Sequence, residues 1–143
     1  MTEAEIDAIP AGLEMNALIA EKVMGQKIYS EAEQRAITGG CAGPDAIVSV
    51  RSFVRHGTPQ SEYIKADRHS TDIAAAWRVI MRMQRQNLGI YLEDFLDVGG
   101  ATVWRAQFSP YPKQEMAWLG FADTPMLAIC RAALKAVNSK AKL

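Results

Sequence analysis

The stretch Ser70–Met83, STDIAAAWRVIMRM, predicts the central helix of the fold. Its large apolar side chains recur at i, i+4, i+7 and i+8, the spacing of one helical face: Ile73, Trp77, Ile80 and Met81. Ser70 is a suitable N-cap, because its hydroxyl can accept a hydrogen bond from a free amide of the first turn. We therefore expect this helix to bury Trp77 in a core, so that Trp77→Ala would cost about 3–5 kcal/mol of stability.

Two further helices flank this one in the sequence, at Pro10–Met24 and Thr124–Val137. Gly25 stops the first helix, since glycine readily adopts the left-handed conformation that ends helices. Pro125 suits the first turn of the last helix, where its missing N–H costs nothing. The last helix has an apolar face with helical spacing, which we expect to be buried: Leu127, Cys130 and Leu134.

Alternating apolar residues predict four strands, at Ala46–Val54, Leu88–Phe95, Ala101–Ser109 and Glu115–Phe121. Turn signals rich in glycine or proline separate the last three, which favours an antiparallel meander. Arg105 faces away from Trp104 in its strand, so its charge must reach water or a ligand. The order of the elements predicts one α+β domain over residues 1–143, in which three helices cover an antiparallel sheet.

The region between the first helix and the central one gives weaker signals. Gln26–Ser30 is a candidate short strand, and Glu31–Thr38 is polar with no clear period. Gly39–Pro44 has the glycines and proline of a loop, and His56–Ser61 has those of a turn. We expect only one more short strand before the central helix begins.

Composition excludes some functions. Sixteen basic and sixteen acidic residues cancel in this chain of 143 residues. A neutral chain is a poor candidate for binding a DNA or RNA polymer, although a local cluster of arginines could hold a small anion. No apolar run approaches the ~20 residues that span a bilayer, and the acidic start MTEAEIDAIP is unlike a signal peptide. Two distant cysteines, Cys41 and Cys130, favour a cytosolic protein with free thiols.

Three blocks of sequence carry a family resemblance: PAGLEMNALIAEKVMG at Pro10–Gly25, HSTDIAAAWRVI at His69–Ile80 and ADTPMLAICRAALKAV at Ala122–Val137. Together they resemble the phage ABA-sandwich domain, a family of small phage and prophage proteins. The resemblance implies an α/β/α sandwich and a viral protein acting in a bacterial cytoplasm. The family usually has Trp and Tyr residues between its first two blocks, whereas Gln26–Arg68 has no Trp, so no binding role of those aromatics is carried over.

No residue pattern predicts catalysis. His56 and His69 are the only histidines, and they lack the spacing of a metal site. The glycine-rich loop around Cys41 lacks the Lys-Ser/Thr of a phosphate-binding loop. Three carboxylates around the first strand of the meander fit a solvated edge: Glu93, Asp94 and Asp97. We therefore expect no catalytic residue, no metal and no cofactor.

Arginine and aromatic side chains are the candidate binding groups, because guanidinium forks clamp phosphates and rings stack on bases. We expect five residues to contact a ligand: Arg55, His56, Arg68, Arg105 and Tyr111. The loop Gly39–Pro44 and the turn Arg55–Pro59 are expected to shape the pocket, since binding residues gather on loops held by a rigid scaffold.

Small phage proteins of this general kind include sponges, which bind the cyclic nucleotides or cyclic ADP-ribose isomers that bacterial defence systems use as alarm signals. By that analogy we expect a protein that sequesters a nucleotide-type immune signal in the cytoplasm of the infected host without cleaving it. The alternative is a module that inhibits a host or defence protein through an exposed aromatic patch. Three Trp, four Tyr and seven Met exceed what three helices must bury, which predicts a homo-oligomer.

Overall fold

A computed structural model of the chain describes residues 1–39, 46–111 and 116–140. The helices are α1 (Glu3–Ala8), α2 (Leu13–Leu18), the π-helical turn η1 (Ile19–Val23), α3 (Glu31–Thr38), α4 (Ile73–Gln84) and α5 (Pro125–Lys140). The strands are β1 (Ile47–Arg55), β2 (Thr58–Lys65), β3 (Leu88–Leu96), β4 (Thr102–Pro110) and β5 (Trp118–Ala122). They form one antiparallel sheet in the order β3-β4-β5 and a separate antiparallel pair, β1-β2. The expected α+β class is confirmed.

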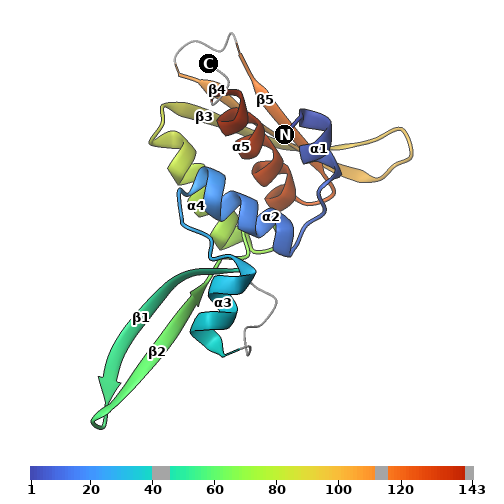
Figure 1. Cartoon of the computed structure of the whole chain (residues 1–143). Helices are drawn as coiled ribbons and strands as arrows, with labels where there is room; N and C mark the ends of the chain where they lie inside the picture. The colour runs from blue at the N-terminus through green and yellow to red at the C-terminus, as the bar shows by residue number, and fades with distance from the viewer. Residues whose placement is uncertain (40–45, 112–115, 141–143) are drawn as a thin grey trace.

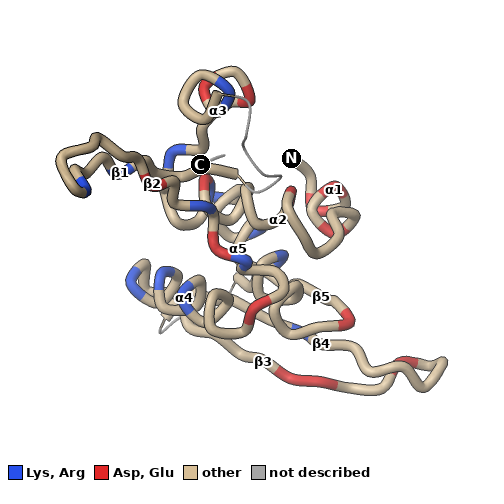
Figure 2. Tube along the Cα trace, turned by 90° about the horizontal axis from the view of Figure 1, so that it is seen from below, with Lys and Arg blue, Asp and Glu red and all other residues tan. Residues whose placement is uncertain are grey.

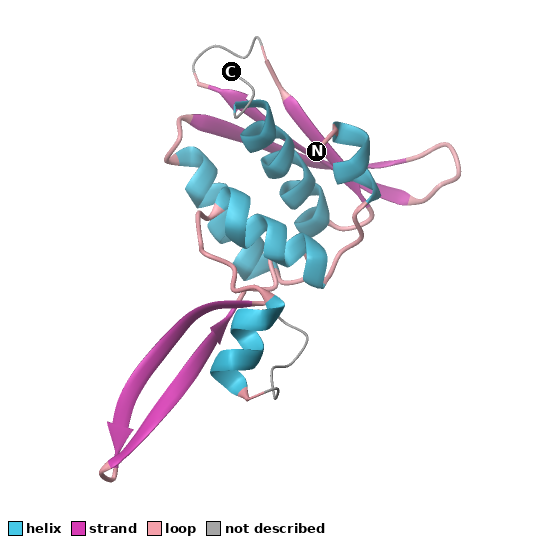
Figure 3. Ribbon diagram, in the orientation of Figure 1, coloured by secondary structure: helices cyan, strands magenta, loops and turns pink. Residues whose placement is uncertain are grey.

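Helices α4 and α5 cover one side of the three-stranded sheet, whereas α3 lies beside the β1-β2 hairpin (Figure 1, Figure 3). Helix α5 packs against β4 and β5, and α4 packs against β3 and α5. The core between these layers is closed by Ala106, Phe108 and Trp118 from the sheet, all buried. Helix α1 packs on α5, and η1 packs on α4 and α5, so the N-terminal segment forms an outer helical layer. The expected meander is confirmed, but the first helix packs mainly on the other helices rather than on the sheet.

Helix α4 is present as predicted, but the face that it buries is not the predicted one. Ile73 and Trp77 are 53% and 56% exposed. The buried residues of α4 are Ala75, Ala76, Val79, Ile80 and Met83. The alanines allow α4 to approach α5 closely, so the face with these small side chains is the one that is buried. The largest side chain, Trp77, remains exposed. Ile80 is buried as expected, and so are the three expected residues of α5, Leu127, Cys130 and Leu134.

The start of α4 also differs from the prediction. Asp72 is the N-cap, since its carboxylate accepts hydrogen bonds from the amides of Ala74 and Ala75 at 2.8 and 3.3 Å. Ser70 is instead buried, and its amide and hydroxyl both donate to Asn16 Oδ1, at 2.9 and 2.8 Å. A serine placed two residues too early for the cap therefore ties α2 to the loop that enters α4.

The N-terminal helix is shorter than predicted and is interrupted. Gly12, with φ of 135°, is the N-cap of α2, so Pro10 lies outside the helix. The helix widens into η1 at Ile19, and Gly25 ends it at a φ of 70°, as expected.

The region 26–68 contains more structure than predicted. Helix α3 begins with a capping box, in which Ser30 and Glu33 satisfy each other's backbone amides. Residues 26–30 form no strand. The chain turns over only two residues, His56 and Gly57, both at positive φ, so that β2 already begins at Thr58. Tyr63 of β2 donates a hydrogen bond to the Ile37 carbonyl at 3.0 Å, which joins α3 to the hairpin. The expected loop at Gly39–Pro44 lies, except for Gly39, outside the described residues.

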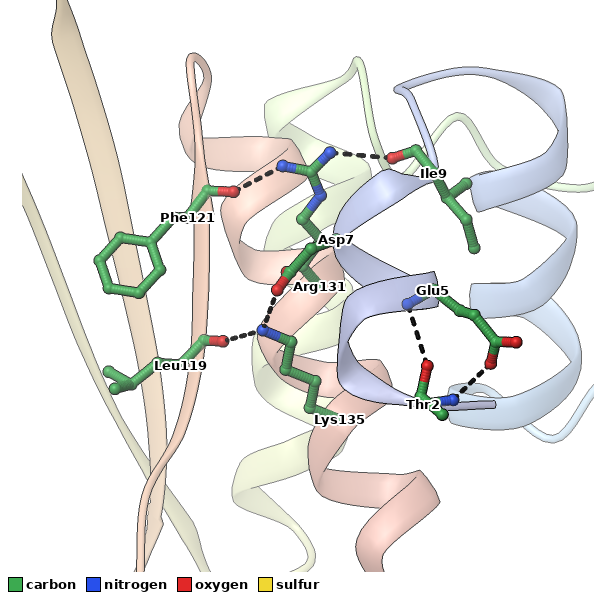
Figure 4. Close-up of polar contacts among 8 residues, drawn as sticks. All are labelled: Thr2, Glu5, Asp7, Ile9, Leu119, Phe121, Arg131 and Lys135. Carbon is green, nitrogen blue, oxygen red and sulfur yellow. Dashed lines mark hydrogen bonds and ion pairs between the residues drawn. The ribbon is translucent and has the colours of Figure 1, made fainter.

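Two cations of α5 tie α1 to strand β5 (Figure 4). Arg131 donates to the carbonyls of Phe121 and Ile9, at 2.6 and 3.0 Å. Lys135 is buried and donates to the Leu119 carbonyl and to the Asp7 carboxylate, both at 2.8 Å. The Leu119 and Phe121 carbonyls of β5 thus accept hydrogen bonds from side chains instead of from a further strand.

Candidate binding surface

The face of the β3-β4-β5 sheet that points away from the helices is the candidate binding surface. Strand alternation and the register of the three strands place eight side chains on it: Tyr91, Glu93, Phe95, Val103, Arg105, Gln107, Leu119 and Phe121. We call this set the outer sheet face. Arg105 lies at its centre, opposite Glu93 on one side and Phe121 on the other.

A charged cluster occupies the middle of the outer sheet face. The guanidinium of Arg105 forms an ion pair with Glu93, and it lies 5.7 Å from the centre of the Tyr91 ring. The Tyr91 hydroxyl donates to Glu93 at 2.6 Å. This hydrogen bond raises the pKa of Tyr91, because ionisation would break it and place a second anion beside the carboxylate. The positive charge of Arg105 is therefore already balanced within the face.

Aromatic side chains extend the face beyond the cluster. Phe95 and Phe121 are both 40% exposed and meet edge to face, with ring centres 6.4 Å apart. Tyr91 is 52% exposed. Three rings this exposed on one face of the sheet, two from β3 and one from β5, form a patch of the kind that marks an interaction site.

A shallow hollow of about 350 Å³ opens on the same side of the sheet. It is lined by Gly89, Ile90, Tyr91, Arg105, Gln107 and Ser109. The Nε of Arg105 is buried beside it and has no hydrogen-bond partner within the described part of the chain. The hollow therefore offers a ring, a guanidinium and two neutral polar side chains to a small ligand.

The five residues predicted from the sequence do not come together. Arg55 and His56 lie at the tip of the β1-β2 hairpin, which projects away from α1, α2, α4 and α5 (Figure 1). Arg68 lies between this hairpin and α4, where its carbonyl accepts from the amides of residues 71 and 72. Arg105 is on the outer sheet face, as its strand position predicted. Tyr111 follows β4 and is 78% exposed. Only Arg105 lines the hollow.

Three residues of the surface were missed in the sequence, and each had a readable signal. Glu93 was interpreted as part of a solvated acidic edge, yet the strand register pairs it with Arg105. Phe95 and Phe121 have the same parity as Glu93 and Arg105 in their strands, so they share that face. What was missing was the knowledge that no described helix covers it.

The other candidates from the sequence are structural where they are described. Cys130 is buried, and desolvation raises its pKa to about 12, so its thiol is unreactive. His69 is buried in the turn before α4 and lies 3.1 Å from the Ala75 carbonyl through Nδ1. Residues 40–45, which include Cys41, lie outside the described part. Among the described residues, no three metal-ligating side chains form a group that could hold a metal ion.

Fold and surface together define a class: a small α+β domain with an antiparallel sheet whose helix-free face is aromatic and carries a paired charge. The model of the phage ABA sandwich domain matches residues 17–134, and the chain belongs to that family. Neither the curated proteins nor the solved structures contain a match. No helix within the described ranges is long and apolar enough to cross a membrane.

Proposed function

We propose that this phage protein is a non-catalytic binding module, and that the outer sheet face binds and inhibits a host or defence protein in the cytoplasm of the infected cell. The observation that carries this proposal is the exposure of Tyr91, Phe95 and Phe121 around a charge-balanced Arg105. Aromatic residues and arginine are the side chains that contribute most binding energy at protein interfaces.

The state of Arg105 favours a protein partner over a phosphate. A phosphate at this site would compete with the Glu93 carboxylate, which is already paired with the guanidinium. A protein surface can instead cover the neutral pair and the rings around it, provided that its own polar groups match.

The test compares binding partners captured from host lysate by the protein and by its Phe121→Glu variant. We expect one host protein to be enriched by the unaltered chain and lost by the variant, because a carboxylate cannot be buried without a partner. Met81→Ala is the matched control, since Met81 is 45% exposed on α4. Titration with the purified partner should then show an affinity loss of at least about tenfold for Phe121→Glu. Equal capture by all three proteins would contradict the proposal.

Sequestration of a nucleotide-type signal is the second candidate, and the hollow beside Tyr91 and Arg105 favours it. A thermal-shift screen should use cyclic dinucleotides, cyclic trinucleotides and cyclic ADP-ribose isomers. A ligand at about a hundred times its Kd should stabilise the protein by about 2.7 kcal/mol. Arg105→Gln should abolish the shift if the ligand sits in the hollow, whereas Arg55→Gln should abolish it if the hairpin tip is the site. Chromatography of the same ligands after incubation tests the expectation that none is turned over.

A further inference from the structure

The β1-β2 hairpin, which we call the ribbon (Ile47–Lys65), has one face that nothing in the proposed function uses. It projects from the helical body (Figure 1), and all of β2 is exposed. In the register of the two strands, Arg51, Phe53 and Arg55 share a face with their partners Glu62, Gln60 and Thr58. Helix α3 contacts the opposite face, where Tyr63 pairs with Val50.

The ribbon is locally basic although the whole chain is neutral. It carries three basic residues and one acidic residue, and Figure 2 shows basic positions along it, including its tip. Within the described part of the chain, neither Arg51 nor Arg55 forms an ion pair or a side-chain hydrogen bond, although Glu62 is the register partner of Arg51. By contrast, Arg105 and Arg131 are held by partners. The two ribbon guanidiniums are therefore available to an anion.

A ring lies between these two cations. Phe53 is 38% exposed, and it sits midway between Arg51 and Arg55 on the same face of β1. Two residues of a strand that are four apart have Cα atoms ~13 Å from each other, so the Cα atoms of Arg51 and Arg55 lie ~7 Å on either side of that of Phe53. Cations that follow a phosphate backbone, with an aromatic face for a base between them, are the recognition pattern for single-stranded nucleic acid.

We propose that this face of the ribbon, Arg51, Phe53 and Arg55, binds single-stranded nucleic acid without sequence preference. A single strand fits better than a duplex, because the Phe53 ring needs an unstacked base and the bases of a duplex are stacked on each other. This site lies on elements other than the outer sheet face, so it stands or falls independently of the proposed function.

The test is fluorescence anisotropy of labelled oligonucleotides of about twelve nucleotides at about 50 mM salt. Single-stranded DNA, single-stranded RNA and a DNA duplex form three arms. We expect both single strands to bind with a Kd of about 1–100 μM and the duplex to bind more weakly. Phe53→Ala should weaken single-strand binding at least about fivefold. The double variant R51Q/R55Q should reduce the slope of log K against log salt by about 1.4.

Two controls separate the face from general effects. Val54→Ala truncates an exposed apolar residue on the other face of the same strand. Arg35→Gln removes one positive charge from α3, where Arg35 is paired with Glu31. Both controls should leave affinity within about twofold of the unaltered protein. The absence of binding to either single strand, or an equal loss in variants and controls, would overturn the proposal and leave the ribbon face to a protein partner. Equal binding of duplex and single strand would overturn the role of Phe53.

Discussion

Gly120 of β5 leaves no room for a side chain. A Cβ at this position would lie 2.2 Å from the Ala128 carbonyl oxygen and 2.5 Å from the Ala132 nitrogen, both on the backbone of α5. We expect Gly120→Ala to destabilise the protein by about 3 kcal/mol or more, because rigid backbone cannot move aside as a flexible side chain could. Denaturation in urea measures the change.

Gly89 of β3 is the matched control for this substitution. A Cβ there would meet only the Ser109 carbonyl oxygen, at an ordinary 3.8 Å. Gly89→Ala should change the free energy of unfolding by less than about 1 kcal/mol. Similar losses at both glycines would show that α5 does not pack on β5 as closely as described.

His69 is a buried histidine that is kept neutral. Desolvation lowers its pKa, and its Nε2 has no hydrogen-bond partner among the described residues. The unfolded chain, with an ordinary histidine pKa of about 6.5, takes up a proton before the folded chain does. Stability is therefore complete above about pH 6.5 and falls as the pH drops from there towards the lowered pKa.

We expect the Tm to fall between about pH 7.5 and pH 5, and the His69→Gln variant to lose most of this dependence. His56→Gln is the control, because His56 is exposed at the ribbon tip. If His69→Gln kept the full pH dependence, another group would have to carry it.

At the scale of the element, helix α4 shows what a hydrophobic pattern can decide and what it cannot. Its sequence contains two stripes, one with Ile73 and Trp77 and one with Ala76 and Val79, and both have helical spacing. Side-chain size pointed to the first stripe, and close packing on α5 buries the second. The existence of the helix could be predicted, whereas its rotation depended on a neighbour that the local pattern does not contain.

The corrected face of α4 reverses the expected effect of Trp77→Ala. Since Trp77 is 56% exposed, we now expect the substitution to cost less than about 1 kcal/mol. Ile80→Ala should cost about 2–5 kcal/mol, because Ile80 is 1% exposed and its loss leaves a cavity. Thermal or urea unfolding of the two variants, side by side, distinguishes the two faces. A larger loss for Trp77→Ala would restore the original prediction.

Asp7 of α1 and Lys135 of α5 form an ion pair, and we expect substitution of the two partners to cost different amounts of stability. The Lys135 side chain is 5% exposed and that of Asp7 44%. Asp7→Asn leaves a buried ammonium without its counter-ion, which should cost about 3 kcal/mol. Lys135→Met leaves the Asp7 carboxylate in contact with water and only the Leu119 carbonyl unpaired, which should cost about 1–2 kcal/mol.

Urea denaturation of the two single variants and the double variant measures this asymmetry. The double variant should be more stable than Asp7→Asn alone, because it no longer buries an unpaired charge. Costs that add without interaction would mean that the ion pair contributes nothing at this position.

Two capping boxes show a signal that a search for apolar period overlooks. Thr2 with Glu5 and Ser30 with Glu33 both start short helices in the structure. Both follow the S/T-x-x-E pattern of a capping box in the sequence. The helix after Ser30 was not predicted, since α3 buries none of its residues and therefore has no apolar stripe to detect.

At the scale of the whole molecule, only part of the site could be predicted. Alternation within β4 was enough to predict that Arg105 and Trp104 point to opposite faces of the sheet. The positions of Arg55 and His56 depended on the ribbon standing apart from the other sheet, and strand patterns do not reveal which sheet a strand joins. The net charge of the chain did not predict these sites either, because a total of zero conceals a basic ribbon and a sheet face on which Arg105 is paired with Glu93.

The homo-oligomer expected from aromatic and methionine content needs an apolar surface, and the outer sheet face is the candidate. We expect weak self-association at high concentration through a two-fold pairing of this face, in competition with its protein partner. Sedimentation between about 5 and 500 μM should show a rising mean mass, which Phe121→Glu should abolish. A constant monomer mass over this range would contradict the expectation.

The hydrogen bonds from Arg131 and Lys135 of α5 to β5 also bear on how large an assembly can become. A sheet with unpaired backbone groups on both edge strands can add copies without limit and grow into a fibre. Here the carbonyls of Leu119 and Phe121 already accept hydrogen bonds, so an incoming strand finds neither of them free at the β5 edge. Within the β3-β4-β5 sheet, strand addition could therefore proceed from β3 alone and would stop after one step. The two cations of α5 thus protect the three-stranded sheet against open-ended growth at its β5 edge.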